Sequence, residues 1–453
     1  MDALKLKTLL SIVIIAIGAL LIPFVVTNSD AMEQQASGFL IDFGDWDVKW
    51  TEMDMQNYSN PYYALEFACQ ENDFTHTVED GIVREINGVF SDDTSTWNLW
   101  TISKNSTTWV KESNTDNVNL SNYVIAAWAF CDEQGTPTIA VDKSGQSIYG
   151  YPQANRIETL TPALTEVAGS IRAINALVGT DSFSQYPPSV VSGKDSGKIK
   201  IVGGYTNPSY EAIVAQRPDI VFCDGYMYAQ YLVAERLRNT GFNAIIMDGG
   251  DSVQGILSNI YIMGVVMGYE MASIQAIMSL EYAVNEITNT VYSSPNAKEV
   301  SVMLAISADK SPWVTGSTTY IDDLSSMVMG RNVFESQYQW VQINSEMIPA
   351  ENPAVIIIYT PEYNATQGEY DSLISSLSSE WRATDAFKNG KIYLVCGSAG
   401  ELALNPSPRY AQLMEITARI LHPDVFTDIE MPNYIGNNYK DYLTFTKDLD
   451  FNN

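Results

Sequence analysis

The chain has 453 residues, 46% of them hydrophobic, which is long enough for about two to four domains with large buried cores. It carries 54 Asp and Glu against 25 Lys and Arg, a net charge of −29 that repels phosphate backbones and excludes nucleic acid as a partner. Only two histidines occur, so we expect no histidine-based metal site. We also expect no cofactor.

The first 35 residues are separate from the folded part. Lys5 and Lys7 precede an uncharged run of about 19 residues, near the minimum length for a membrane span. This pattern is typical of a cleaved signal peptide or an N-terminal membrane anchor, and both remain open. The positive end stays inside, so we expect the chain after Asn28 to lie on the extracellular side. No Cys precedes Cys69, which excludes a lipid-modified Cys after the run.

Residues 38–148 are rich in Trp, Thr, Asn and Asp, and runs such as GFLIDFGDWDVKW and NYVIAAWAFC alternate apolar with polar residues. Such alternation indicates β-strands, and PYYALEFAC reads as one short helix. We expect a small β-rich domain. Its Cys69 and Cys131 form a candidate disulfide, because an exported chain tolerates such bonds. Cys223 and Cys396 are either buried thiols or a second bridge.

From about residue 150, short apolar strands alternate with helices. RIETL, IVFCD and FNAIIMD read as strands, and TPALTEVAGSIRAINAL reads as a helix beginning at Thr-Pro. The alternation returns with VSVMLAI, AVIIIY and KIYLVC, with helices around DSLISSLSSEWRATDAF and RYAQLMEITARIL. A long helix between the two series has apolar residues at spacings of three and four. The pattern predicts parallel sheets covered on both faces.

The predicted fold is therefore α/β, with two Rossmann-like lobes joined by a long inter-lobe helix and preceded by the β-rich domain. The predicted parts are the signal or anchor (1–35), the β-rich domain (38–148), the N-terminal lobe (150–268), the inter-lobe helix (269–293), the C-terminal lobe (294–430) and a C-terminal tail (431–453).

Each predicted lobe contains one copy of a repeat. YTNPSYEAIVAQRPDIV and WVQINSEMIPAENPAVI share a leading aromatic residue, a Glu and the frame E-x-I-x-A-x-x-P-x-[IV]-[IV]. The apolar positions suit a short helix that leads into a buried strand. Glu211 and Glu346 are either helix-start charges favoured by the helix dipole or acidic docking sites, one on each lobe, for a partner with two basic sites.

Four aromatic residues lie in predicted strand-exit loops. Tyr205 and Trp340 lead the two repeats, while Phe183 and Trp313 lie in a further loop of each lobe. Ligands bind at the carboxyl ends of parallel strands, so these residues are either ordinary core aromatics or the walls of a cleft for a large, flat, apolar ligand. No Arg or Lys clamp for a strongly anionic ligand is evident near these loops.

The sequence lacks the common motifs of covalent catalysis. It contains no G-x-S-x-G, no G-x-x-x-x-G-K-[ST] and no HExxH, and two histidines leave little scope for a Ser-His or Cys-His device. A hydrolase using paired carboxylates stays open. We expect a binding protein and not an enzyme.

Several stretches resemble the substrate-binding proteins of ABC importers for cobalamin, ferric siderophores and haem. They are RIETLTPALTEVAGSIRAINALVGTDSFSQYPP, IVGGYTNPSYEAIVAQRPDIVF, WRATDAFKNGKIYLV and NPSPRYAQLMEITARILHPDVF, and the resemblance covers about residues 150–425. It implies two lobes that clamp a ligand, a rigid helix between them, and an ABC permease with its ATPase as partner. In that family one Glu of each lobe pairs with permease arginines, and Glu211 and Glu346 match these by motif.

The resemblance also suggests the ligand. Phe183, Tyr205 and Trp340 line up with aromatic contacts of the cobalamin binders, and Trp313 falls near another, which implies cobalamin or a related corrinoid. The alternatives are a ferric-siderophore or haem receptor of the same fold, and a cell-surface enzyme or adhesin on this scaffold. We expect a monomer, anchored by its N-terminal segment or secreted.

The early domain is also similar to a known module. Its order of ALEFAC, VREINGVF and a late AAWAF strand is similar to the small β-rich domain at the end of transcobalamin-type proteins. This similarity implies a second contact to a corrinoid. An adhesion or spacer module is the alternative interpretation.

Overall fold

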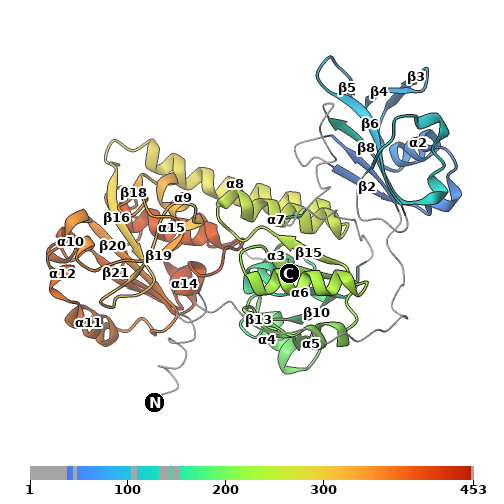
Figure 1. The fold of residues 1–453 in the computed structure, drawn as a ribbon. Coiled ribbons are helices and arrows are strands. Elements are labelled where there is room, and N and C mark those ends of the chain that lie inside the picture. The colour runs from blue at the N-terminus through green and yellow to red at the C-terminus, as the bar shows by residue number, and fades with distance from the viewer. Residues whose placement is uncertain (1–37, 44–47, 104–109, 132–141, 144–153, 450–453) are drawn as a thin grey trace. The chain divides into compact units, whose positions relative to one another are not determined.

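The computed structural model describes residues 38–43, 48–103, 110–131, 142–143 and 154–449 (Figure 1). The chain forms two compact units. One holds the β-rich domain, the N-terminal lobe and residues 259–274, and the other holds residues 248–258 and the chain from residue 275 onward. The predicted signal or anchor lies outside the described residues. Within those residues, no helix combines the length and apolar character that a membrane span requires.

The β-rich domain has a five-stranded main sheet in the order β2-β1-β8-β6-β7, in which only β1 and β8 run parallel. These strands are β1 (Gly38–Asp42), β2 (Val48–Glu52), β6 (Thr96–Ser103), β7 (Val110–Lys111) and β8 (Tyr123–Cys131). A second antiparallel sheet contains β3 (His76–Glu79), β4 (Ile82–Ile86) and β5 (Val89–Phe90).

Helix α2 (Pro61–Glu71) packs onto this domain's core. The Asn60 side chain accepts the Tyr62 N–H at 2.8 Å and Pro61 occupies the first turn, two features that favour a helix start. The inward residues of α2 are buried with Phe39 and Trp128 of the main sheet. The domain therefore has its own hydrophobic core, as its apolar alternation indicated.

The predicted disulfide of the β-rich domain is not formed. Cys69 and Cys131 are both free. Cys69 lies in the core on α2, where burial and the nearby Glu85 raise the pKa of its thiol to about 12. Cys131 ends β8, and its sulfur lies 3.7 Å from the carbonyl oxygen of Ala129. Cys223 and Cys396 are buried free thiols, the first of the two interpretations left open for them.

The N-terminal lobe has a five-stranded parallel sheet in the order β11-β10-β9-β14-β15. Its strands are β9 (Ile157–Thr159), β10 (Leu177–Thr180), β11 (Lys200–Ile201), β14 (Ile220–Asp224) and β15 (Ala244–Met247), and a separate hairpin joins β12 (Gly203–Gly204) to β13 (Asn207–Pro208). The helices are α3 (Pro162–Ser170), α4 (Pro188–Asp195), α5 (Tyr210–Ala215) and α6 (Tyr228–Asn239).

Both faces of this sheet are covered, as the apolar strands predicted. On one face, Val221 and Ile246 pack with Ile213 of α5 and Leu237 of α6. On the other side, the Thr159 hydroxyl lies 2.7 Å from that of Thr165 on α3. Helices on both faces are what a buried parallel sheet requires.

Helix α3 is shorter than the sequence predicted. It begins at the Thr-Pro pair, where the Thr161 side chain accepts the Leu164 N–H at 3.2 Å. It ends at Ser170 because Arg172 adopts a left-handed φ of 65°, which a continuing helix cannot contain. The end of the predicted helix instead contributes to strand β10.

A dipeptide from far upstream covers the last strand of this sheet. The Lys143 N–H donates to the carbonyl of Ile246 on β15 at 3.1 Å, and the Asp142 carboxylate accepts the Ile246 N–H at 2.8 Å. Asp142 also forms an ion pair with Arg238 of α6, and its side chain is only 1% exposed. Residues 142–143 therefore bind the sheet edge like a short additional strand.

The chain crosses between the two units in helices α7 (Val253–Val266) and α8 (Glu270–Tyr292), the second of which is the long helix expected over residues 269–293 (Figure 1). The start of α7 belongs with the C-terminal lobe, where the Val253 N–H donates to Asp323 at 3.1 Å. The chain thus leaves the unit of the N-terminal lobe first after residue 247 and finally after residue 274, whereas we expected this lobe to end at residue 268.

The C-terminal lobe has a seven-stranded sheet in the order β19-β17-β16-β20-β21-β22, with β18 also paired to β16. Its strands are β16 (Val300–Ala305), β17 (Trp313–Thr315), β18 (Gly330–Asn332), β19 (Trp340–Gln342), β20 (Val355–Thr360), β21 (Ile392–Cys396) and β22 (Tyr434–Ile435). The helices are α9 (Tyr320–Met327), α10 (Met347–Glu351), α11 (Gln367–Ser376), α12 (Ser379–Arg382), α13 (Asp385–Lys388), α14 (Gly397–Leu402) and α15 (Tyr410–Leu421).

Strand β20 shows how both faces of this sheet are filled. Ile356 and Ile358 pack in a cluster with Trp381 of α12. Tyr359, the next residue along the strand, points to the opposite face, where its hydroxyl lies 3.3 Å from that of Thr417 on α15. Figure 1 shows the sheet between these two sets of helices.

Two segments of this lobe differ from the sequence prediction. The single helix expected around DSLISSLSSEWRATDAF is three short helices, because Leu377 and Ser378 are extended and Thr384 caps a new turn. The segment after residue 430 was expected to be a tail, but β22 within it pairs with β21 and extends the sheet.

Candidate functional site

The aromatic residues predicted for the N-terminal lobe meet at its strand exits. Phe183 follows β10, and Tyr205 lies in the turn between β12 and β13. Their rings are in edge-to-face contact, with centroids 5.4 Å apart and planes at 75°. Phe183 is 47% exposed and Tyr205 is half-buried, so the pair offers an apolar surface to solvent and is not part of the core.

A buried polar cluster fixes the loop that carries Phe183. The Asp181 carboxylate accepts the N–H groups of Phe183 and Ser184 at 2.7 and 3.2 Å, and also accepts the Ser184 hydroxyl. Lys194 of α4 donates to the carbonyls of Asp181 and Ser184 at 2.8 and 2.5 Å. Burial raises the pKa of Asp181 and lowers that of Lys194. The ammonium group of Lys194 thus binds the loop backbone.

The hairpin that carries Tyr205 depends on a glycine. Gly203 has a φ of 122°, and a Cβ there would lie 2.7 Å from the carbonyl oxygen of Asn207. Only glycine allows the two hairpin strands to approach this closely. Burial, with the nearby carboxylates of Asp181 and Asp224, raises the pKa of the Tyr205 hydroxyl.

A third strand exit of this lobe also carries aromatic residues, which sequence reasoning missed. Tyr226 and Tyr228 follow β14 and are 41% and 70% exposed. The Asp224 carboxylate accepts the N–H groups of Tyr226 and Met227 at 2.8 and 3.0 Å, which shapes the turn. The rule that singled out Phe183 applies equally to the segment CDGYMY after the predicted strand, so the signal was present in the sequence.

The two aromatic residues predicted for the C-terminal lobe share one surface. Trp313 lies on β17 and Trp340 on β19, where the antiparallel register pairs Trp313 with Gln342 and Thr315 with Trp340. Directly paired residues point to the same face, and so do residues two apart, so both tryptophans lie on one face of the ribbon. Both tryptophans thus lie in short strands and not in the loops that we expected.

Both tryptophans are half-buried. Within the part of the chain that the structure describes, the Trp313 indole N–H is buried and has no hydrogen-bond partner, although buried tryptophans usually find one. The structure therefore brings the predicted aromatic residues together as two pairs, one in each lobe.

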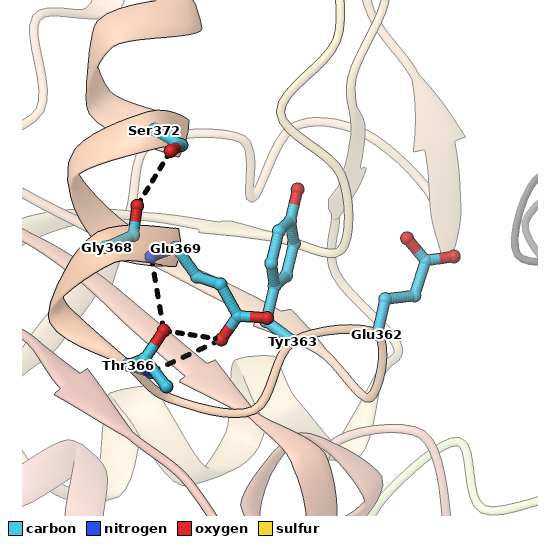
Figure 2. A pocket seen from close by; sticks show the side chains of 6 residues that line it. All are labelled: Glu362, Tyr363, Thr366, Gly368, Glu369 and Ser372. Carbon is cyan, nitrogen blue, oxygen red and sulfur yellow. Dashed lines mark hydrogen bonds between the residues drawn. The ribbon is translucent and has the colours of Figure 1, made fainter.

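A pocket of about 480 Å³ opens after β20 in the C-terminal lobe. Figure 2 shows its lining residues, which are Glu362, Tyr363, Thr366, Gly368, Glu369 and Ser372. The Glu369 carboxylate turns back to the start of α11, where it accepts the N–H and hydroxyl of Thr366 in a capping box. Partial burial opposes charging of Glu369, but these hydrogen bonds outweigh it and lower its pKa. The pocket contains none of the predicted aromatic residues.

The two repeated glutamates are both exposed, but only one is paired. Glu211, in the first turn of α5, forms an ion pair with Arg236 of α6 at 3.1 Å. Glu346 directly precedes α10, and among the described residues it has no ion pair. Arg217 and Asn352, equivalent residues just before the repeat prolines, both adopt left-handed backbone, with φ of 49° and 42°. The copies therefore share a backbone path as well as a sequence pattern.

Comparison with known proteins identifies the family. Residues 157–397, more than half of the chain, match the family of periplasmic binding proteins. The chain belongs to this family. The match confirms the predicted resemblance at the level of the family and of its fold, while the cobalamin branch stays a prediction. Among the described residues, no three His, Cys, Asp or Glu side chains lie close enough to hold a metal ion.

Individual relatives of this periplasmic binding protein are distant. The chain is 23% identical over 293 residues to YvrC of Bacillus subtilis, named as an ABC transporter substrate-binding lipoprotein, covering 64% of this chain and 88% of YvrC. It is 22% identical over 212 residues to a vitamin B12-binding protein of Pectobacterium atrosepticum, covering 46% of this chain and 72% of that protein.

Comparison with solved structures shows a shared fold. The periplasmic haem-binding protein BhuT matches with a TM-score of 0.51 and 18% identity, over 60% of this chain and 98% of that one. The β-rich domain precedes the region that matches the family.

Proposed function

We propose that this periplasmic binding protein captures cobalamin or a related corrinoid outside the cell membrane and delivers it to an ABC permease. The observation that carries the proposal is the aromatic surface on each lobe, formed by Phe183 with Tyr205 and by Trp313 with Trp340. A flat macrocycle is bound well by exposed ring faces with few charges. The similarity to a vitamin B12-binding protein supports the same ligand.

The proposal assigns roles to the other predicted features. The N-terminal segment anchors the chain at the membrane or is removed on export, and the protein acts as a monomer without covalent chemistry. Glu211 and Glu346 are exposed and dock onto basic residues of the permease. The β-rich domain provides a second contact to the corrinoid. A cell-surface enzyme or adhesin on the same scaffold is the alternative from another class.

A haem receptor is the second candidate, and one observation favours it. The Lys143 side chain runs past Gly225 after β14, where a Cβ on Gly225 would lie 3.5 Å from the Cβ and Cγ atoms of Lys143. Lys143 is exposed, and its Cβ and Cγ atoms thus lie beside a strand exit that carries exposed tyrosines. A cation at this place suits haem propionates or an acidic siderophore better than a neutral corrin ring.

Titration of the purified full-length chain with cyanocobalamin, haem and a ferric siderophore tests both candidates. We expect cyanocobalamin to bind most tightly. Lys143→Ala should then leave its affinity unchanged, whereas a haem receptor would lose affinity for haem. Tyr205→Ala with Trp340→Ala removes two ring faces that together contribute at least about 1.4 kcal/mol, so the dissociation constant should rise about tenfold or more. Binding of none of the three probes would reject the receptor function.

The docking role needs a separate measurement. Glu211→Ala with Glu346→Ala should leave the affinity for cyanocobalamin intact and lower uptake by cells that contain the permease. A loss of affinity in solution would instead place these glutamates at the ligand.

A further inference from the structure

Gln230, near the start of α6, is a buried polar residue with a specific set of contacts. It has no exposed surface. Its side-chain carbonyl accepts the Asp224 N–H at 2.6 Å, and its amide nitrogen donates to the carbonyls of Leu160 at 3.0 Å and Tyr205 at 2.8 Å. Leu160 follows β9, Tyr205 lies between β12 and β13, and Asp224 ends β14. One side chain therefore joins three separate strand exits of the N-terminal lobe.

The chemistry of these contacts requires a side-chain amide. Glutamine offers one carbonyl acceptor and two N–H donors, and all of these groups are used here. A glutamate of the same length keeps an acceptor but has at most one O–H donor, and that only when it is protonated, so at least one of the two carbonyls loses its hydrogen bond. A methionine fills the same volume and makes none of the three bonds.

These contacts connect Gln230 to the ligand-facing aromatic residues. Gln230 holds the backbone carbonyl of Tyr205, whose ring contacts Phe183. It also holds the N–H of Asp224, whose carboxylate accepts the Tyr226 N–H. We infer that Gln230 is a positioning residue, which sets the placement of the aromatic surface of the N-terminal lobe without touching the ligand. In its effect on the ligand, this inference rests on the proposed function.

Substitutions of Gln230 test the inference through ligand affinity. Gln230→Glu and Gln230→Met in the full-length chain should each raise the dissociation constant for cyanocobalamin about tenfold, the effect of one lost buried hydrogen bond or slightly more. Gln412 of α15 is a matched control in the other lobe, because it is also buried and hydrogen-bonded. Its carbonyl accepts the Tyr439 hydroxyl at 2.9 Å, and its amide nitrogen lies 3.5 and 3.4 Å from the carbonyls of Thr446 and Leu449. Gln412→Glu should leave the affinity unchanged. Unchanged affinity in both Gln230 variants would overturn the inference.

A double-mutant cycle separates positioning from a general loss of stability. If Gln230 acts through Tyr205, the effect of Gln230→Met on affinity should shrink about threefold or more in a Tyr205→Ala background, since residues acting through one contact are not additive. An equal effect in both backgrounds would overturn the inference.

Hydrogen exchange of the unaltered protein gives a test that depends on neither the ligand nor the variants. The Asp224 N–H should exchange as slowly as the amides within β14, because its acceptor is a fully buried carbonyl. Fast exchange at Asp224 would show that the Gln230 contacts do not persist and would overturn the inference, whichever probe binds. If no probe binds but exchange at Asp224 is slow, the proposed ligand is wrong and the role of Gln230 in joining the loops stands.

Discussion

The two α/β lobes each contain a glutamate with no exposed surface, and they treat it in opposite ways. Glu158 lies on β9 of the N-terminal lobe, and neither of its carboxyl oxygens has a hydrogen-bond partner among the described residues. Burial raises the pKa of Glu158 to about 9, although Arg156 opposes the shift. Its carboxyl group is therefore protonated at neutral pH.

Glu415, on α15 of the C-terminal lobe, is surrounded by donors. It accepts the guanidinium of Arg419 at 3.0 Å and the N–H groups of Thr444 and Thr446 at 2.6 and 2.9 Å. Arg419 in turn binds Asp428 at 2.8 Å. The difference teaches that the segment after residue 430 supplies the hydrogen bonds that a buried carboxylate needs, while the N-terminal lobe must keep its carboxyl group neutral instead.

The largest effect is expected from Arg419→Met. This change leaves Glu415 buried without its cationic partner, which should lower the free energy of unfolding of the C-terminal lobe by about 3–5 kcal/mol. Urea denaturation followed by hydrogen exchange of β20 peptides measures it. Arg331→Met is the matched control, because it breaks an exposed pair with Glu299 and should cost about 1 kcal/mol or less. Equal losses of stability in Arg419→Met and Arg331→Met would contradict a special role for the buried pair.

Glu158→Met should have the opposite effect and raise the free energy of unfolding of the N-terminal lobe. Holding this carboxyl group neutral at pH 7 costs about 3 kcal/mol, since its pKa in the unfolded chain is near 4.5. Methionine has similar length and needs no partner, so the N-terminal lobe should become about 2–3 kcal/mol more stable. The same change at Glu415 should destabilise its lobe. Urea denaturation followed by hydrogen exchange of β14 peptides measures the stability change in Glu158→Met. A loss of stability in this variant would show that the carboxyl group has a partner.

The lobes should also differ in their response to pH. The pKa of Glu158 is higher in the folded state, so its contribution is complete below pH 4.5 and is lost as the pH rises to about 9, with a slope of up to about 1.4 kcal/mol per pH unit. Hydrogen bonding to Arg419 lowers the pKa of Asp428 from 3.8 to about 2, so its contribution is present above pH 3.8 and is lost toward pH 2. Denaturation of each lobe across this range should show opposite trends, and Glu158→Met should remove the alkaline one.

The smallest effect concerns the repeated glutamates. Arg236→Ala breaks an exposed ion pair with Glu211 and removes the guanidinium that stacks 3.7 Å above the Tyr210 ring, so the N-terminal lobe should lose about 1 kcal/mol or less. Glu211 then loses its ion pair with Arg236 and resembles Glu346, which has none among the described residues. Thermal melts of Arg236→Ala and Glu346→Ala measure the difference, and a loss of several kcal/mol in either variant would show that these residues hold the fold together.

Much of this architecture was predictable because it depends on local sequence patterns. Apolar strands alternating with helices predicted the parallel sheet of the N-terminal lobe and the parallel strands of the C-terminal lobe, but not its antiparallel strands β17 and β19. The Thr161-Pro162 pair predicted the start of α3, and the repeat predicted matching segments in both lobes. Strand β10 was not predicted, because the apolar residues continue without a break across Arg172 and read as one helix. The left-handed backbone at Arg172, which ends α3, is not visible in that pattern. The end of α11 at Leu377 is likewise set by backbone angles that the residue types do not predict.

The candidate site was predictable in part. Phe183 and Tyr205 were found by their place after predicted strands, and Tyr226 would have been found by applying the same rule to one more loop. The role of Gln230 could not be predicted, because its three partners come together only in the folded lobe. The lack of partners for Glu158 has the same origin, since burial and neighbours are properties of the tertiary structure.

The dipeptide at residues 142–143 has a consequence for how the chain can be shortened. Asp142 and Lys143 occupy the backbone groups of Ile246 on β15, a strand of four buried apolar residues at the end of the sheet. A truncated protein that starts near residue 154 would open the N–H and the carbonyl of Ile246 to the solvent. Uncovered apolar edges recruit strands from other molecules. We therefore expect the region that matches the family to aggregate more readily by itself than together with residues 142–143.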